Sequence, residues 1–279
     1  MGLDTTKDKG DKVMEFNTEK IRNNLKIELY NDHFQNYKRY NIPKAQLVIA
    51  DIPYNLGNNA YASNPSWYID GDNKNGESKK ANKSFFDTDN DFRIAEYMHF
   101  CSKLLIPEPK EKNKAPAMIV FCAFEQMHMV IEEGKKHGFE NSYPLLFIKN
   151  FSGQVLKANM KIVGATEYAV VLYRDKLPKF NNGKKEGEPG KMVFNWIEWR
   201  KDNSVPKIHP TQKPIPVLKR LIEIFTDKGD VVIDPVAGSA TTLRACAELE
   251  RSCYGFEIKK DFCNKAREEM LADIQLFMN

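Results

Sequence analysis

The amino-acid sequence predicts an α/β fold in which helices cover both faces of a mostly parallel, doubly wound sheet. Short, continuous apolar runs such as Gln46–Ala50 are typical of strands that are buried on both faces. The last third of the chain follows the order helix, strand, turn, helix and strand, which is the pattern of parallel strands joined by helical crossovers. With 279 residues, of which 42% are hydrophobic and 29% charged, the composition is that of a globular protein and excludes collagen-like and disordered classes.

The first part of the chain predicts an arm followed by most of the sheet. Residues 1–25 are polar, lysine-rich and aperiodic, so we expect a mobile arm there and a single domain over residues 26–279. A helix is predicted at Phe92–Leu104 from its apolar spacing. Strands are predicted at Ile27–Tyr30, Gln46–Ala50, Met118–Phe124, Tyr143–Ile148 and Tyr168–Tyr173.

Two long irregular segments interrupt these elements and are predicted to be inserts. Residues 55–90 are rich in Asn, Ser, Asp, Gly and Lys, with isolated aromatic residues. Residues 178–207 are loop-like and combine a surplus of lysine and arginine with Phe194, Trp196 and Trp199. Irregular segments of this length are either functional or disordered. Each is therefore a candidate for contact with an anionic partner, with a merely solvated loop as the alternative.

The last third of the chain predicts the most regular series of elements. A helix begins at Pro214, with apolar residues at helical spacing up to Phe225. The elements predicted after it are a strand at Val231–Ile233, a small-residue turn at Asp234–Ala240, a helix at Thr241–Leu249 and a strand at Cys253–Phe256. The two strands are expected to be parallel neighbours, because a helix connects them.

Cysteine usage and the apolar runs bear on location. The five cysteines form no Cys-x-x-Cys pair and have no histidine at metal-ligand spacing, so we expect free thiols, no metal and a cytoplasmic location. The longest apolar run, Ala117–Phe124, is shorter than the roughly 18 residues of a membrane span, and no membrane association is expected. The formal net charge of +4 permits an anionic partner without requiring one.

The candidate functional residues follow the carboxyl ends of two predicted strands. Ligands of a doubly wound sheet bind beyond such ends. After the first of them, Asp234–Thr242 supplies small residues that let a backbone approach a ligand, and a helix N-terminus with free N–H groups. Glu257 ends the next strand 19 residues after Gly238, where a carboxylate can accept hydrogen bonds from ribose hydroxyls. An ordinary tight turn is the alternative.

The second strand end carries Asp51-Ile52-Pro53-Tyr54. The Asp51 carboxylate and the Ile52 carbonyl are both acceptors for an exocyclic amine, and Tyr54 offers a ring face on which a flat heterocycle can stack. We expect Asp51 to be ionised near neutral pH. The alternative is an Asp-initiated turn with a packed tyrosine.

Three segments resemble motifs of the β-class amino-group DNA methyltransferases, which act on adenine N6 or cytosine N4. Asp51–Tyr54 resembles their D-P-P-Y motif, and Asp234–Thr242 resembles their D-P-F-x-G-S-G-T-T loop. Residues 209–214 match their H-P-T-Q-K-P segment in full, and the order of the motifs resembles the circular permutation of this class. The resemblance covers roughly Ile27–Leu271 and implies a Rossmann-like, S-adenosylmethionine-dependent methyltransferase fold.

The resemblance implies a role for each matched residue. Asp51, Ile52, Pro53 and Tyr54 would be catalytic. S-adenosylmethionine would be held by Asp32, His209, Thr211, Lys213, Asp234, Pro235, Ala237, Gly238, Ser239, Thr241 and Glu257. Within that set, Asp32 would reach the adenine of the cofactor and Glu257 its ribose. For His209 and Lys213, a helix-capping or surface role is the alternative.

The resemblance also implies a substrate and partners. The substrate would be DNA, most simply double-stranded, in which the target base is extruded from the stack. The aspartate that opens the motif favours adenine N6. The alternatives are cytosine N4, RNA, a protein glutamine, a small heterocycle, and a catalytically weak or inactive DNA-binding relative. A homodimer and a companion restriction endonuclease are further partners that the family suggests. Candidate DNA contacts are Lys79, Lys80, Lys184, Lys185, Arg200 and Lys201, and residues 178–207 are the candidate target-recognition region.

Three positions depart from the family motifs. Ile52 replaces a proline, but its acceptor is a main-chain carbonyl and a residue before proline is extended in any case, so we expect the motif to keep its geometry. Ala240 replaces a glycine, and a requirement for positive φ there would cost about 1 kcal/mol. Val236 replaces a phenylalanine and removes an aromatic contact to the cofactor.

Overall fold

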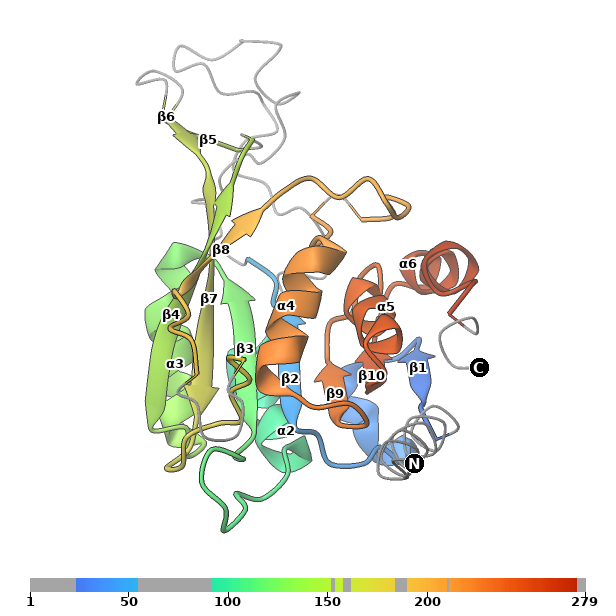
Figure 1. Ribbon diagram of the computed structural model, residues 1–279. Coiled ribbons are helices and arrows are strands. Elements are labelled where there is room, and N and C mark those ends of the chain that lie inside the picture. Colours follow the sequence, from blue (N-terminus) through green and yellow to red (C-terminus); the bar gives the residue numbers. More distant parts are fainter. Residues whose placement is uncertain are drawn as a thin grey trace, which may run out of the picture.

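The structure is a computed structural model that describes residues 24–54, 92–151, 154–157, 162–183, 190–209 and 211–274. These ranges form an eight-stranded sheet with helices on both faces (Figure 1). The strand order is β1-β10-β9-β2-β3-β7-β4-β8. The predicted arm lies outside the described residues except for Asn24 and Leu25, and the side chain of Leu25 is buried. The predicted α/β class with a mostly parallel sheet is confirmed.

The sheet is parallel apart from one strand. Its central pair, β2 (Leu47–Asp51) and β3 (Ala117–Cys122), continues on one side through β9 (Val231–Asp234), β10 (Ser252–Phe256) and β1 (Ile27–Tyr30). On the other side lie β7 (Thr166–Tyr173), β4 (Asn141–Lys149) and β8 (Trp196–Trp199). Only β7 among these strands runs antiparallel to its neighbours. The carboxyl ends of the others therefore lie at one edge of the sheet, together with the beginning of β7.

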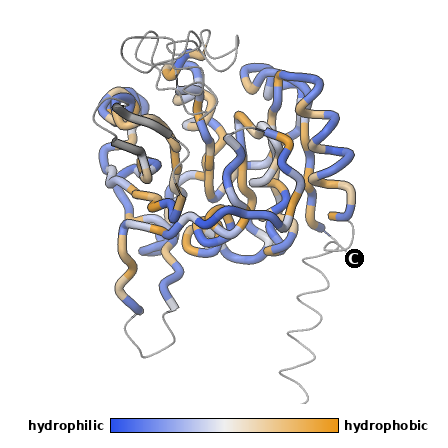
Figure 2. The backbone as a smooth tube through the Cα atoms, turned by 90° about the horizontal axis from the view of Figure 1, so that it is seen from above, coloured by the Kyte–Doolittle hydropathy of each residue, from blue (hydrophilic) through white to orange (hydrophobic). Residues whose placement is uncertain are grey.

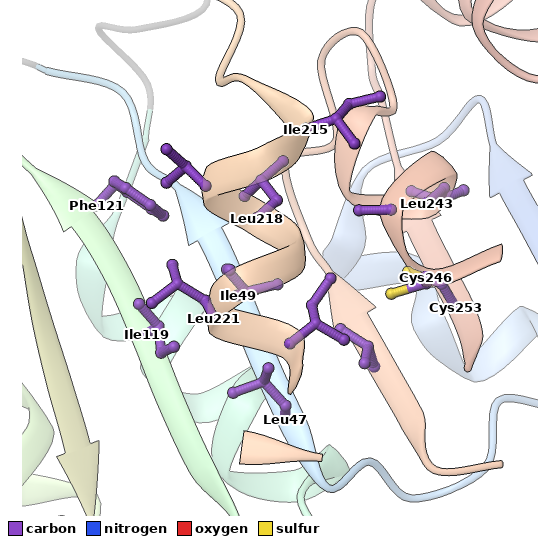
Figure 3. Packing of buried hydrophobic residues seen from close by; sticks show 14 of the residues in the cluster. Leu47, Ile49, Ile119, Phe121, Ile215, Leu218, Leu221, Leu243, Cys246 and Cys253 are labelled. Atoms are coloured by element: carbon purple, nitrogen blue, oxygen red, sulfur yellow. The ribbon is translucent and has the colours of Figure 1, made fainter. Parts of the chain in front are cut away.

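Helices cover the two faces because side chains alternate along each central strand. In β2, Leu47 and Ile49 point to the face of the sheet that α4 (Ile215–Phe225) covers, and α5 (Thr241–Glu248) contributes to the same apolar cluster (Figure 3). Val48 and Ala50 face the opposite way, into a second apolar cluster with α2 (Ile94–Leu104) and α3 (Met127–Lys136). Burial on both faces explains why these strands are continuous apolar runs.

Several shorter elements complete the described chain. A 3-10 helix, η1, spans Phe34–Arg39, and another, η5, spans Phe124–Gln126. The C-terminal helix α6 (Lys260–Lys265) continues into a π-helical turn at Ala266–Met270. Two further strands, β5 (Gln154–Lys157) and β6 (Ile162–Gly164), pair with each other outside the main sheet and lie on the connection between β4 and β7. Because β4 ends and β7 begins at the carboxyl edge, this ribbon lies beyond that edge (Figure 1).

Hydrophobic residues occur in short stretches throughout the described chain (Figure 2). Among the residues that the structure describes, no helix has the length and apolarity to cross a membrane. All five cysteines are buried and none forms a disulfide.

Some sequence predictions differ from the structure. The loop-like interpretation of residues 178–207 is wrong at Trp196–Trp199, which form strand β8 at the edge of the main sheet. The strand predicted at Met118–Phe124 ends at Cys122, and the ring of Phe124 is exposed at the start of η5. Helices α3 and α6 were not expected. The insert predicted at residues 55–90 lies outside the described residues.

Gly255 of β10 is required by close packing. A Cβ atom at this position would lie 2.7 Å from Cδ1 of Leu243 and 3.1 Å from Cβ of Ala237. The first distance is shorter than real Cβ contacts and the second is tighter than most, so a larger residue here would force Leu243 and Ala237 to shift. The absence of a side chain at Gly255 thus allows Leu243 of α5 and Ala237 of the preceding loop to pack closely on β10.

Candidate functional site

The structure brings the two predicted strand ends together. Strands β2 and β9 are parallel neighbours, with Leu47 opposite Val232 and Val48 opposite Ile233. Asp51 and Asp234 therefore end adjacent strands at the same edge. The chain continues from β9 to β10 on one side and from β2 to β3 on the other, so the strand order reverses between them. This switch point is where doubly wound sheets bind ligands.

Asp51 has one occupied and one unoccupied carboxylate oxygen. Its Oδ2 accepts a hydrogen bond from Nζ of Lys213 at 2.5 Å. Its Oδ1 is buried and has no hydrogen-bond partner among the described residues. Burial raises the pKa of Asp51 above its ordinary value, while the Lys213 ammonium opposes that shift. A buried acceptor without a partner costs free energy, and a ligand N–H would recover it.

The remainder of the Asp51–Tyr54 motif is anchored through its main chain. Ile52 donates its N–H to the carbonyl of Phe121 at 3.1 Å, which extends the pairing of β2 with β3 by one residue. The carbonyl of Pro53 accepts a hydrogen bond from Nε2 of Gln126 at 3.0 Å. Gln126 is itself buried, and its Oε1 accepts the N–H of Ala123. The bend at Pro53 is thus held by a side chain from the neighbouring strand's connection.

Tyr54 is anchored by a glutamate that the sequence motifs do not contain. Its hydroxyl donates to Oε2 of Glu167 at 2.9 Å, and Oε1 of Glu167 accepts from Nζ of Lys149 at 2.5 Å. Burial raises the pKa of Glu167, but the Lys213 and Lys149 ammonium groups and the hydrogen bonds outweigh it, so the net shift is downward. Glu167 therefore carries a negative charge beside the motif.

Lys213 lies inside the site, so the alternative interpretation of Lys213 as a surface residue is wrong. Its side chain is only 7% exposed, and its ammonium contacts Asp51. The Nζ atom is 5.3 Å from the ring centroid of Phe121, 5.6 Å from that of Trp199 and 5.7 Å from that of Tyr54. Aromatic faces at these distances stabilise a partly desolvated cation. Trp199 belongs to β8, so the segment expected to be a loop also contributes to the site.

The loop after β9 is held by two buried carboxylates. Oδ1 of Asp234 accepts the N–H of Val236 at 3.1 Å, and burial raises the pKa of Asp234 to about 7 against the opposing effects of Thr242 and Val236. Oε2 of Glu257 accepts the N–H of Gly238 at 2.9 Å, and burial raises its pKa as well. Glu257 at the end of the next strand is therefore bonded to this loop, and its contact with a cofactor ribose stays a prediction.

The backbone of this loop is strained at Ala240, the position where the family motif has a glycine. Ala240 has φ +60° and ψ +26°, which is the left-handed region. Side chains disfavour that region, so the alanine carries a strain that glycine would not. The other residues of this segment that were predicted to hold the cofactor form the turn and the start of α5; they are Pro235, Ala237, Ser239 and Thr241. Ala237, Ser239 and Thr241 are buried.

His209 and Lys213 each lie beside one of the two strand ends, His209 near Gly238 and Lys213 against Asp51. Cδ2 of His209 is 4.0 Å from the Cβ position of Gly238, and its ring centroid is 4.7 Å from that of Phe262. Its Nδ1 accepts the N–H of Thr211 at 3.3 Å. Burial, together with the nearby Lys213 and Lys259 charges, lowers the pKa of His209 to about 4. This histidine is therefore neutral at physiological pH and lies beside the glycine loop.

Asp32 follows β1 and is surrounded by its own segment. Its Oδ1 accepts the N–H of His33 at 2.8 Å and Nδ2 of Asn36 at 2.7 Å. Its Oδ2 accepts the hydroxyl of Tyr40 at 2.9 Å and lies 3.3 Å from Arg39. The hydrogen bond from Asn36 is the largest of the effects that lower its pKa. These contacts stabilise η1, and the contact of Asp32 with a cofactor adenine stays a prediction.

The predicted DNA contacts are described only in part. Arg200 and Lys201 follow β8 at the carboxyl edge, and both side chains are exposed. Arg200 donates to Glu198 at 2.9 Å, and Nζ of Lys201 lies 4.9 Å from the ring centroid of Phe151. Lys79, Lys80, Lys184 and Lys185 lie outside the described residues. In the described ranges, no group of three or more His, Cys, Asp or Glu side chains is placed to hold a metal ion.

Sequence reasoning missed Glu167 and Lys149. Lys149 ends β4 and Glu167 lies near the start of β7, and these paired strands are antiparallel. Both residues reach the carboxyl edge for that reason. The sequence shows that Lys149 and Glu167 each border an apolar strand, but it does not show the direction in which β7 runs.

A family model agrees with the three motifs. The model described as DNA methylase, N6_N4_Mtase, matches residues 45–268, which is well over half of the chain. The match includes both strand ends and the segment between them.

Relatives with curated names are similar over parts of the chain. The DNA adenine methyltransferase YhdJ of Escherichia coli is 25% identical, over 86% of this chain and 81% of that protein. The type II methyltransferase M.HindIII of Haemophilus influenzae is 43% identical over 56% of this chain and 51% of its own length. M.HpaI of Haemophilus parainfluenzae is 34% identical over 30% of this chain. The matches span about a quarter of M.HpaI and half of M.HindIII.

Solved structures share the fold. The M1.HpyAVI–SAM complex superposes with a TM-score of 0.58 at 21% identity, over 86% of this chain and 98% of that one. The cytosine-N4-specific PvuII DNA methyltransferase superposes with a TM-score of 0.56 at 14% identity, over 90% of each chain.

Proposed function

The chain belongs to the N6/N4 DNA methylase family, and from this premise we propose that it transfers a methyl group from S-adenosylmethionine to the N6 amine of adenine at a specific site in double-stranded DNA. One observation carries the proposal. The buried Oδ1 of Asp51 has no partner among the described residues, and it lies at the strand end next to the Asp234–Ala240 loop. An acceptor in that position fits an exocyclic amine N–H brought to the switch point.

The residues beyond β9 and β10 fit S-adenosylmethionine. Glu257 presents a carboxylate at the loop, and the neutral His209 beside Gly238 adds no positive charge next to a sulfonium. The small side chains of Ala237 and Ser239 would allow a ligand to approach the backbone of this loop closely. When bound, S-adenosylmethionine supplies an electrophilic methyl group on a positively charged sulfur.

Asp51 and the Ile52 carbonyl would orient the amine. The lone pair of the adenine N6 amine is delocalised into the ring, so the free amine is a poor nucleophile. Two acceptors that bind its two hydrogens favour a more tetrahedral nitrogen, whose lone pair is then available. The carboxylate form of Asp51 is needed for this, because a protonated acid gives up part of its acceptor capacity. Most of the acceleration would come from holding two reactants in a reactive orientation.

Tyr54 would support the base by stacking. A base inside a duplex cannot be reached by these groups, so the target is proposed to be extruded, at a cost of a few kcal/mol. Stacking of the base on an aromatic ring offsets about 1–3 kcal/mol of that cost. The Glu167 hydrogen bond holds the ring from its far end. Arg200 and Lys201 are proposed to bind phosphates, which positions the duplex without reading its sequence.

We propose adenine rather than cytosine as the target base for two reasons. An aspartate opens the motif, and the chain is similar to YhdJ, which is named as a DNA adenine methyltransferase. A homodimer and a companion restriction endonuclease remain proposals on family grounds, the second in line with the type II methyltransferases among the relatives.

The test is methyl transfer by the purified protein. Duplex DNA is incubated with S-adenosylmethionine carrying a labelled methyl group, digested to nucleosides and analysed by mass spectrometry, with single-stranded DNA and RNA as parallel substrates. Long-read sequencing of the treated duplex then locates the modified positions. Labelled N6-methyladenine at one sequence context is expected. N4-methylcytosine would overturn the choice of base, and no labelled nucleoside on any substrate would overturn the activity.

A further inference from the structure

A buried group of four charges joins Asp51 and Tyr54 on the side of β4 and β7. We define it as the charged cluster of Asp51, Lys149, Glu167 and Lys213. Lys213 lies 2.5 Å from Asp51 and 4.0 Å from Glu167, and Lys149 lies 2.5 Å from Glu167. The only described hydrogen bond of the Tyr54 hydroxyl is the one it donates to Glu167 at 2.9 Å.

The topology of the sheet assembles this cluster. Glu167 comes near the start of the antiparallel strand β7, opposite Phe147 of β4. Lys149 follows at the end of β4, so both side chains are at the carboxyl edge. Lys213 reaches the same point from the segment before α4. Three segments that are distant in the sequence therefore converge on the strand end that carries the Asp51–Tyr54 motif.

The cluster is balanced and poorly solvated. Its two anions and two cations cancel, and the side chains of Lys213, Lys149, Glu167 and Asp51 are 7%, 10%, 17% and 27% exposed. Removing one member of such a group leaves an uncompensated charge in a dry position, which disturbs the remaining contacts. Glu167 is the member that contacts both lysines and the Tyr54 hydroxyl.

The geometry points to Glu167 as a positioning residue for methyl transfer, one that fixes the Tyr54 ring through its hydroxyl and holds Lys213 against Asp51. This inference rests on the proposed function, in which the Tyr54 ring and the Asp51 carboxylate bind the same target base. A stacking ring needs a defined plane, and a hydrogen bond at its far end restricts its rotation. The same carboxylate keeps Lys213 between the two anions, so Oδ2 of Asp51 stays engaged and Oδ1 stays directed away from the lysine.

A double-mutant cycle tests this inference. Tyr54→Phe removes the hydroxyl but keeps the ring, and Glu167→Ala removes the anchor. Each is expected to lower the single-turnover rate of methyl transfer about tenfold or more, which is the usual effect of losing one hydrogen bond to a charged group. The double variant is expected to be no slower than Glu167→Ala alone, because the hydroxyl acts through the carboxylate. The Kd for S-adenosylmethionine is expected to be unchanged in all three.

Further variants separate positioning from folding. Glu167→Gln retains an acceptor oxygen and is expected to recover part of the rate that Glu167→Ala loses, and it replaces that variant in the cycle should Glu167→Ala unfold. Glu132→Gln is the matched control, since Glu132 also pairs with a lysine, but on the outer surface of α3. Thermal unfolding is measured for each variant.

The outcomes distinguish this inference from the proposed function. Wild-type protein that transfers no methyl group to DNA would overturn the proposed function, and the inference with it. Active wild-type protein with undiminished transfer in Glu167→Ala and Glu167→Gln would overturn the role of Glu167 alone. So would independent, multiplicative losses in the double variant, because they would show that the two side chains do not act together.

Discussion

Nζ of Lys213 lies 2.5 Å from Oδ2 of Asp51, although the two residues are 162 positions apart in the sequence. The contact joins the segment at residues 209–214 directly to the Asp51–Tyr54 motif. It occupies one oxygen of the carboxylate and leaves the other, Oδ1, buried without a partner among the described residues. Lys213 therefore acts on the proposed acceptor itself, and its role in binding a cofactor stays a prediction.

Lys213→Met is expected to make methyl transfer more sensitive to acid. Burial raises the pKa of Asp51 and Lys213 lowers it, so removing the ammonium raises that pKa further. The acceptor carboxylate is then lost at a higher pH as the solution is acidified, and the acidic limb of the rate profile moves to higher pH. The charged and titratable groups that act on or respond to Asp51 are Lys213, Glu167, Lys149, Tyr54, Cys122 and Asp234.

The measurement for Lys213→Met is the single-turnover rate between about pH 5 and pH 9, a window that brackets neutrality. Lys219→Met is the matched control, because Lys219 of α4 pairs with Glu248 away from both strand ends. An acidic limb that stays in place, or that moves to lower pH, would contradict the assignment of Lys213 to Asp51.

Ala240→Gly is expected to stabilise the protein. Ala240 has φ +60°, and the left-handed region costs a residue with a side chain about 1–2 kcal/mol relative to glycine. The gain is reduced by the greater freedom of glycine in the unfolded chain, so about 1 kcal/mol or less should remain. Urea unfolding of the variant measures it. Ala247→Gly in helix α5 should instead lose stability, and a loss of similar size at both positions would contradict the strain at Ala240.

His209→Gln is expected to reduce the loss of stability on acidification. The folded-state pKa of His209 is about 4, below its ordinary value of 6.5. Between these values the unfolded chain binds the additional proton, so the histidine destabilises the fold progressively as the pH falls from 6.5 towards 4. The free energy of unfolding of the cofactor-free protein is measured across this window. His128→Gln, at an exposed position of α3, is the control, and an unchanged slope in His209→Gln would refute the burial effect.

Arg200→Ala combined with Lys201→Ala is expected to weaken DNA binding equally for all sequences. Both side chains are exposed after β8 at the edge that carries the site. If they bind phosphates, their loss lowers the slope of log affinity against log salt by about 1 for each contact. Binding to duplexes of different sequence at several salt concentrations measures this. A change confined to one sequence would instead assign them to base recognition.

The central strands and both strand ends could be predicted because burial on two faces leaves a local signature. Runs such as Leu47–Asp51 are continuous in the sequence, and the glycine loop and the acidic ends follow them directly. The helix predicted from Pro214 is equally local, because its apolar residues recur at helical spacing along α4. These elements depend on neighbours in the sequence, so sequence reasoning could reach them.

The remaining features depend on how distant segments meet. Glu167 joins the site only because β7 runs antiparallel, and the sequence of β7 does not specify its direction. Trp199 belongs to a short edge strand whose polar flanks resemble a loop. The salt bridge of Lys213 with Asp51 required the segment before α4 to lie over β2. Packing between elements, rather than composition, decides each of these contacts.

The most direct test of the account is Asp51→Ala, measured for both methyl transfer and cofactor binding. The variant removes the carboxylate but leaves the loop after β9, so we expect transfer to duplex DNA to be abolished while calorimetry still detects binding of S-adenosylmethionine. Asp175→Ala, at an exposed position after β7, should keep both properties. Undiminished methyl transfer by Asp51→Ala would contradict the account.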